Sequence, residues 1–139
     1  MNEDAADRIF AETLGYPYFI QEWGSQLWNF IEREPITTGD VNKVRDAVLY
    51  SLDSNFFQIR MERVTAAERV FLAAMASVAS TEGVCGIAEV ARTMNVMQSA
   101  IAQRRASLIR KGMIYSPHQG AIAFTVPLFA EYLRRHSDE

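Results

Sequence analysis

The sequence is short of the residues that build covalent or metal-bound scaffolds. Its 139 residues include one cysteine and two histidines. Cys85 alone cannot form a disulfide within the chain, and the histidines at 118 and 136 lie in no metal-binding spacing. The sequence therefore predicts neither an internal disulfide nor a metal site. A single free thiol also favours a reducing compartment, and we expect the protein to be cytoplasmic.

Long apolar runs are missing as well. No stretch approaches the roughly 18 consecutive apolar residues that mark a membrane-spanning helix. The first residues, MNEDAADR, are acidic and lack the basic start and apolar segment of a secretion signal. We expect no membrane partner and no export.

The sequence contains none of the common short catalytic motifs. There is no G-x-x-x-x-G-K-[ST] phosphate loop, no H-E-x-x-H metal motif and no C-x-x-C pair. Cys85 lies among small residues without a neighbouring base, which is typical of an inert thiol. The sequence predicts no catalytic residue, so we expect the chain by itself not to be an enzyme.

What remains is a globular chain with an uneven charge. Hydrophobic residues make up 49% and charged residues 22%, which is ordinary for one domain or two small ones. Residues 1–62 hold 11 acidic and 5 basic residues, a net charge of −6. Residues 63–139 hold 6 and 9, a net charge of +3, which suits contact with phosphate groups.

Helical periodicity dominates residues 1–62 and predicts a three-helix bundle. Gly15 and Pro17 separate the first two helices, Pro35 ends the second, and the third follows a cap at Thr37 or Thr38 and runs to about Met61. Thr37 with Asp40 resembles a capping box for the third helix, although Thr38 is a competing cap. The apolar faces expected for the three helices are, in order, Ala6, Ile9, Phe10 and Leu14; Phe19, Trp23, Leu27 and Phe30, widened by Ile20 and Ile31; and Val41, Val44, Val48, Leu52, Phe56 and Ile59.

Residues 63–139 have the order of elements of a winged helix-turn-helix. A capping box at Thr65–Glu68 opens a helix, and a loop of small residues over 80–86 follows it. A short helix over 87–94, a turn at 95 and a helix over 97–111 come next. Two strands around a turn at 116–121 and a last helix after Pro127 complete the unit. The predicted fold is mainly α: a three-helix bundle over 1–62, then a winged helix with a small β-hairpin over 63–139.

The helix over 97–111 is the main candidate for contact with nucleic acid. Stepping 100° per residue places Met97, Ile101, Arg105 and Leu108 toward the core. The opposite face and its flanks are small, amide-bearing and basic, which suits phosphates and base edges, although a merely solvated helix face would look similar. The predicted nucleic-acid contacts are Ser99, Gln103, Arg104, Ser107, Arg110 and Lys111, with His118 and Gln119 at the hairpin turn.

The segment L-G-Y-P-Y-F-I over residues 14–20 resembles the G-x-P segment in the helical lid of AAA+ and STAND-type ATPases. Together with the winged helix, the layout is similar to the C-terminal half of a prokaryotic AAA+ ATPase such as the archaeal origin-recognition initiators. This resemblance covers nearly the whole chain, with residues 1–62 as the lid and 63–139 as the winged helix.

The resemblance implies a nucleotide-binding core upstream in the same protein, which would bind ATP with Mg²⁺. No cofactor is expected for residues 1–139 alone. In such lids the glycine–proline segment contacts the nucleotide, so Gly15, Tyr16, Pro17 and Tyr18 become candidate contacts, with Pro17 against the adenine. Origin-recognition proteins usually carry an arginine at the place of Tyr18, and a tyrosine favours packing on the base over phosphate sensing.

Two functions follow from this reading. In the first, the winged helix binds nucleic acid, expected to be double-stranded DNA, under control of the nucleotide state upstream. In the second, it is a protein–protein or autoinhibitory module that docks on the ATPase core or on another partner. The chain has no catalytic activity of its own in either case.

Overall fold

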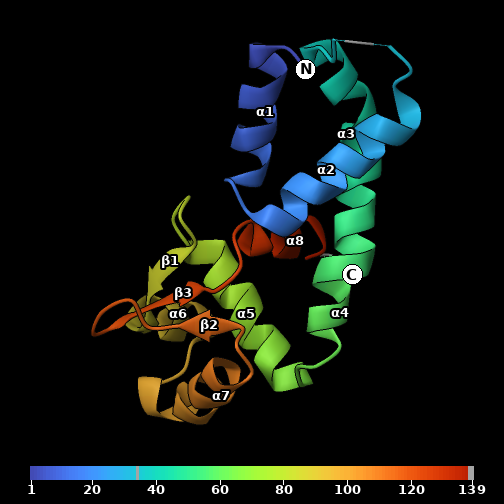
Figure 1. The fold of residues 1–139 in the computed structure, drawn as a ribbon. Helices are drawn as coiled ribbons and strands as arrows, with labels where there is room; N and C mark the ends of the chain where they lie inside the picture. The colour runs from blue at the N-terminus through green and yellow to red at the C-terminus, as the bar shows by residue number, and fades with distance from the viewer. Residues whose placement is uncertain (34, 138–139) are drawn as a thin grey trace. The chain divides into compact units, whose positions relative to one another are not determined.

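The computed structural model describes residues 1–33 and 35–137 (Figure 1). The chain divides into two compact units, Met1–Ile59 and Arg60–Glu139. This division lies three residues before the expected boundary between 62 and 63. The structure confirms the predicted fold class, because it is mainly helical with a small antiparallel sheet.

The N-terminal unit is built from helices joined by short turns. Its elements are α1 (Glu3–Thr13), α2 (Pro17–Phe30), α3 (Thr38–Leu52), the π-helical turn η1 (Asp53–Phe57) and the start of α4 (Gln58–Met61). Pro17 occupies the first turn of α2, as expected from its missing N–H group. Gly15 has a φ of +77°, which lets the chain turn between α1 and α2.

Of the four residues predicted for the buried face of α1, Ile9 is buried and Ala6 is exposed. The buried residues are Ala5, Ile9 and Thr13, whereas Phe10 and Leu14 are exposed. Thr13 can be buried because its hydroxyl donates to the Ile9 carbonyl at 2.8 Å, so no polar group is left unpaired. A pattern of apolar residues alone does not predict a buried threonine at this position.

The predicted stripe of α2 is right at three positions and wrong at its end. Phe19, Trp23 and Leu27 are buried, but Phe30 at the last turn is 65% exposed. The helix ends at Phe30, five residues before Pro35. Ile20, which the sequence predicts to widen the buried stripe, is 41% exposed. Trp28 is 82% exposed and contributes nothing to the core.

The π-helical turn changes which residues of the third helical segment are buried. An α-helical spacing predicts Leu52, Phe56 and Ile59 on one face. The turn at Asp53–Phe57 inserts one extra residue per turn, so Phe56 and Phe57 are both buried and Ile59 is exposed. The Phe56 and Phe57 rings meet edge to face, with centroids 5.1 Å apart.

The C-terminal unit has the element order of a winged helix. Its elements are α5 (Ala66–Val78), β1 (Val84–Gly86), α6 (Ile87–Met94), α7 (Gln98–Arg110), β2 (Ile114–Tyr115), β3 (Ala121–Phe124) and α8 (Phe129–Arg135). The strands form one antiparallel sheet in the order β1-β3-β2. The loop between β2 and β3 projects away from the helices of this unit as the wing (Figure 1).

Strand β1 replaces part of the loop that the sequence predicts over 80–86. Cys85 lies in this strand, where it pairs with Ile122 of β3 and is buried. The small residues of the segment hid a strand because three residues are too few to show an alternating pattern. The predicted position of Cys85 in a loop is therefore wrong, because the residue lies in a strand.

The capping box of α3 has the predicted geometry. The Thr37 hydroxyl accepts from the Asp40 N–H at 3.4 Å, and the Asp40 carboxylate accepts from the Thr37 N–H at 2.9 Å. This backbone N–H, with other hydrogen bonds and cations nearby, holds the pKa of Asp40 below its ordinary value despite its burial. Thr38 is the first residue of the helix and not its cap.

Replacing Thr37 with alanine is expected to lower the free energy of unfolding by about 1 kcal/mol, because one orphan N–H at the start of α3 loses its acceptor. Thr38→Ala is the matched control and should change stability by less than about 0.5 kcal/mol. Urea denaturation followed by circular dichroism measures both. Equal losses in the two variants would contradict the assignment of Thr37 as the cap.

Candidate nucleic-acid interface

The helix-turn-helix is formed by α6, a tight turn and α7. Asn95 has a φ of +57° and ends α6 in the left-handed conformation, as the sequence predicts. Met97 is the N-cap of α7 in extended conformation, with no side-chain hydrogen bond to the helix. It is 77% exposed, so its predicted place in the core is wrong, because it precedes the first turn of the helix.

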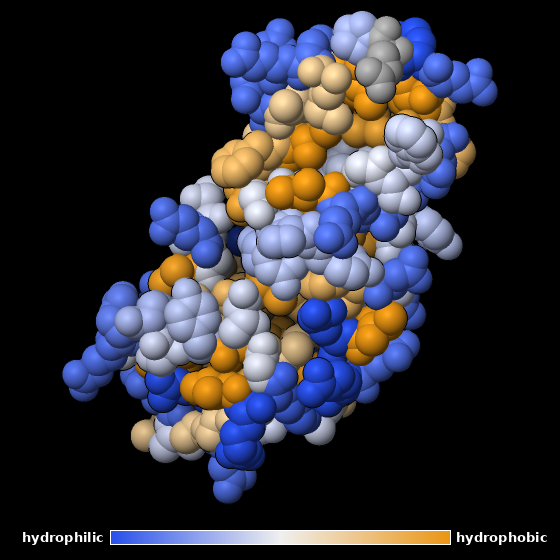
Figure 2. All heavy atoms as spheres, viewed as in Figure 1, coloured by the Kyte–Doolittle hydropathy of each residue, from blue (hydrophilic) through white to orange (hydrophobic). Residues whose placement is uncertain are grey.

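Helix α7 is anchored by two buried side chains, Ile101 and Leu108, and by half-buried Arg105. The opposite face is exposed and carries Ser99, Gln103, Ala106 and Arg110. The exposure of these four residues makes the outer face of α7 accessible to a partner along most of the helix. Figure 2 shows hydrophilic, weakly polar and hydrophobic residues side by side in the lower part of the view, where Figure 1 places α6 and α7.

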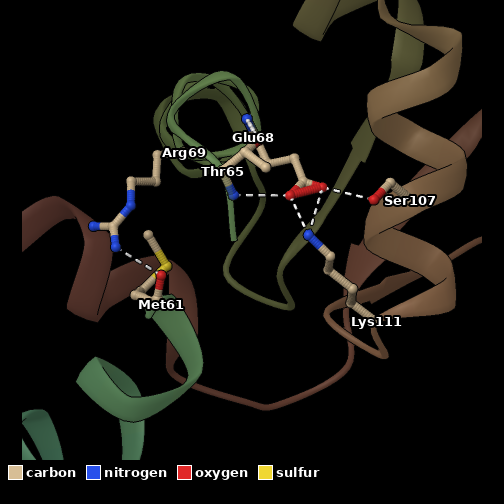
Figure 3. Close-up of polar contacts among 6 residues, drawn as sticks. All are labelled: Met61, Thr65, Glu68, Arg69, Ser107 and Lys111. Atoms are coloured by element: carbon tan, nitrogen blue, oxygen red, sulfur yellow. Dashed lines mark hydrogen bonds and ion pairs between the residues drawn. The ribbon is translucent and has the colours of Figure 1, made fainter. Parts of the chain in front are cut away.

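Ser107 and Lys111 do not belong to this accessible face. The Ser107 hydroxyl donates to the Glu68 carboxylate at 2.7 Å, and the Lys111 ammonium donates to both oxygens of the same carboxylate at 2.5 and 3.2 Å (Figure 3). Glu68 is the buried capping residue at the start of α5. Both predicted nucleic-acid contacts are thus used to join α7 to α5, and their assignment as contacts is corrected.

Glu68 is an ionised carboxylate buried between two helices. Burial raises its pKa, but hydrogen bonds from Lys111, from the Thr65 N–H at 2.9 Å and from Ser107 outweigh burial and lower the pKa from 4.5 to about 2. The carboxylate is therefore charged throughout the neutral range. Its charge offsets that of Lys111 in the folded unit.

Three arginines remain available for a polyanion. Arg92 on α6 and Arg110 on α7 are exposed, and Arg104 is half-buried. Among the described residues no carboxylate pairs with any of the three. Arg92 was missed from the sequence, although one signal could have found it: residues 90–130 contain no aspartate or glutamate.

Arg105 lies toward the core, where the sequence places it. Its Nε atom is buried and has no hydrogen-bond partner within residues 1–33 and 35–137. The side chain as a whole is half-buried, as is common for long cationic side chains at the edge of a core. Arg105 is therefore not part of the accessible face of α7.

The wing is exposed and carries no lysine or arginine over residues 116–120. Its turn is held by the Ser116 hydroxyl, which donates to the carbonyls of His118 and Ala121 at 3.0 and 2.9 Å. His118 and Gln119, the two predicted contacts of the wing, are both exposed at the tip. Any electrostatic attraction to phosphates must therefore come from the helices.

The segment that resembles an ATPase lid lies at the start of α2. The Tyr16 ring packs on Phe19 and Phe56, with centroid distances of 4.7 and 6.0 Å. Tyr18 covers another part of Phe56 at 4.7 Å and is 44% exposed. Of the four candidate nucleotide contacts, Tyr18 thus presents an aromatic ring that is both supported and partly accessible, while Gly15 and Pro17 set the turn.

Among the described residues, the thiol is buried and the potential metal ligands are not grouped into a site. Burial, with a smaller effect from Glu89, raises the pKa of the Cys85 thiol to about 11, so it stays protonated at neutral pH. Within the part of the chain that the structure describes, no three histidine, cysteine or carboxylate side chains are grouped to hold a metal ion. Over the same residues, none of the helices has both the length and the apolar character needed to span a bilayer.

The order of elements, the β1-β3-β2 sheet and the exposed second helix define residues 60–137 as a winged helix-turn-helix unit. Residues 54–133 match a family described as a domain of unknown function, DUF8462. That range is more than half of the chain, so the chain belongs to this family. No curated protein and no solved structure matches the chain.

Proposed function

We propose that the C-terminal unit binds double-stranded DNA through the exposed face of α7. The observation that carries this proposal is the set of three arginines, Arg92, Arg104 and Arg110, which lack carboxylate partners among the described residues. None of the three is held in an ion pair among the described residues, so each can contact a phosphate group. Ser99 and Gln103 on the same helix supply polar groups that can reach base edges.

The length and position of α7 suit this task. It spans 13 residues, or roughly 20 Å at 1.5 Å per residue, which is enough to follow a major groove. Its start has no capping side chain, so the first backbone N–H groups are open to an anion. The wing lies in the same unit and offers an exposed polar tip for a second contact.

The test is a titration of a fluorescent DNA duplex with the full chain at several salt concentrations. Three phosphate contacts predict a slope of log affinity against log salt of about −2.7, since each contributes roughly 0.9. A variant with glutamine at positions 92, 104 and 110 should lose this slope. Lys43→Gln, which removes an exposed cation of the N-terminal unit, is the control and should keep it.

A second candidate, docking to a protein partner, is favoured by one observation. Val96 and Met97 are 40% and 77% exposed at the turn before α7, and apolar side chains there suit a protein surface. If the wild-type chain shows no binding to duplex DNA at micromolar concentration in low salt, the DNA proposal fails. Docking on an ATPase core or another protein, including an autoinhibitory contact, then becomes the better account.

For the N-terminal unit we propose the role of a nucleotide lid of an AAA+ or STAND-type ATPase. Three helices follow one another in it, and the glycine–proline turn leads into an aromatic cluster with Tyr18 at its edge. ATP with Mg²⁺ would be bound mainly by an upstream core, and Tyr18 would pack on the base. A G-x-x-x-x-G-K-[ST] motif encoded upstream of residue 1 would support this role, and a different type of domain there would overturn it.

A further inference from the structure

We infer that the DNA recognised by α7 contains A·T base pairs at the centre of its contact, read from the major groove. This inference rests on the DNA-binding function proposed above and specifies its ligand. It follows from the side chains that the first half of the helix exposes, because that half of a recognition helix contacts base edges.

Four exposed residues occupy neighbouring positions on the outer face of α7: Ser99, Ala102, Gln103 and Ala106. They lie opposite the buried anchors Ile101 and Leu108, so the orientation of this face is fixed by the core. The face presents one amide, one hydroxyl and two methyl groups. It contains no charged side chain before Arg110.

The amide and the methyl groups each match one part of an A·T pair, while the Ser99 hydroxyl can contact either kind of pair. A glutamine amide can bond adenine through N6 and N7 at once, and an alanine methyl can contact the C5-methyl group of thymine. The usual reader of guanine is arginine or lysine, and the usual reader of cytosine is a carboxylate. The exposed residues over 98–103 include neither, so this surface lacks the groups that select a G·C pair.

Arg104 and Arg110 lie at positions from which they would contact DNA phosphates and not base edges. Arg110 follows Gln103 by seven residues, or roughly 10 Å along the helix axis. Arg104 is half-buried on a flank of α7, away from the centre of the outer face. Phosphate contacts from these positions fix the register of the helix without selecting a base.

The experiment compares four duplexes of equal length and alternating sequence: dA-dT, dG-dC, dA-dU and dI-dC. The dA-dT duplex should bind about tenfold more tightly than dG-dC, since one good amide–adenine contact is worth about that factor. The dA-dU duplex lacks the thymine methyl and should bind several-fold more weakly than dA-dT. The dI-dC duplex presents guanine-like groups in the major groove and A·T-like groups in the minor groove, so it should bind as dG-dC does.

Gln103→Ala should remove about tenfold of the preference for dA-dT over dG-dC and leave the salt slope unchanged. The control is Gln21→Ala, at an exposed glutamine of α2 in the other unit, and it should alter neither quantity. Equal binding to all four duplexes would overturn the inference while leaving DNA binding intact. Binding of dI-dC as tight as that of dA-dT would overturn it in favour of minor-groove readout, and absence of binding to every duplex would remove the proposed function itself.

Discussion

Replacing Glu68 with alanine is expected to lower the free energy of unfolding of the C-terminal unit by about 3–5 kcal/mol. Its carboxylate accepts hydrogen bonds from the Thr65 N–H, from Ser107 and from Lys111 within a buried site. Alanine would leave each of these donors without its acceptor, and it would leave the Lys111 ammonium partly buried without an opposite charge. The loss therefore exceeds that of an ordinary helix cap.

Urea denaturation measures this change, with Glu82→Ala as the control at an exposed glutamate of the same unit. The control should change stability by less than about 0.5 kcal/mol. Glu68→Gln keeps an acceptor oxygen but loses the charge, so its effect should fall between the two. A loss below about 1 kcal/mol in Glu68→Ala would mean that the network contributes no more than a surface ion pair.

The same carboxylate predicts a defined pH dependence. The pKa of Glu68 is about 2 in the folded unit, against the ordinary value of 4.5 that applies to the unfolded chain. The unfolded chain therefore binds the proton more readily than the folded one. The contribution of Glu68 is therefore complete above about pH 5 and is lost as the pH falls from 4.5 toward 2, by about 3 kcal/mol in total. The Glu68→Gln variant should lack this part of the acid sensitivity and serves as its control.

The parts of the fold that depend on residues close together in the sequence could be predicted. Both capping boxes are found where the motif places them, since Thr37 with Asp40 and Thr65 with Glu68 interact over three positions. The left-handed turn at Asn95 is local in the same sense. Strand β1 could not be predicted, because its residues pair with residues of β3 that lie 35 to 39 positions further along the chain.

The π-helical turn at Asp53–Phe57 was equally hidden, because the apolar spacing there fits an ordinary α-helix up to Phe56. What favours the wider turn is the burial of two adjacent phenylalanines, Phe56 and Phe57, in one aromatic cluster with Phe19. That gain depends on packing between helices. A pattern along one helix carries no information about it.

In the candidate site, too, the sequence predicts what depends on neighbouring residues and misses what depends on residues far along the chain. The exposed positions of Ser99, Gln103 and Arg110 agree with the orientation that helical periodicity predicts for α7. The true partner of Ser107 and Lys111 lies 39 and 43 residues earlier, at Glu68. Charge counting alone treats every lysine as available, so it cannot tell a paired cation from a free one.

Arg110→Gln and Lys111→Gln are accordingly expected to differ sharply although they are adjacent and remove the same charge. Arg110→Gln should weaken duplex DNA binding about tenfold at about 50 mM salt and reduce the salt slope by roughly 0.9. Lys111→Gln should leave the slope unchanged, because the ammonium is already neutralised by Glu68. Fluorescence anisotropy on one duplex at several salt concentrations measures both variants.

Glu68→Gln turns this comparison into a test of the charge pairing itself. Without the carboxylate, the Lys111 side chain, which is 29% exposed, becomes a free cation at the C-terminal end of α7. The variant should therefore be less stable than the wild type and yet show a salt slope steeper by up to roughly 0.9. Adding Lys111→Gln to it should return the slope to the wild-type value. A wild-type slope that falls on Lys111→Gln alone would show instead that Lys111 leaves Glu68 to contact DNA, and that the ion pair seen in the free protein is exchanged for a phosphate on binding.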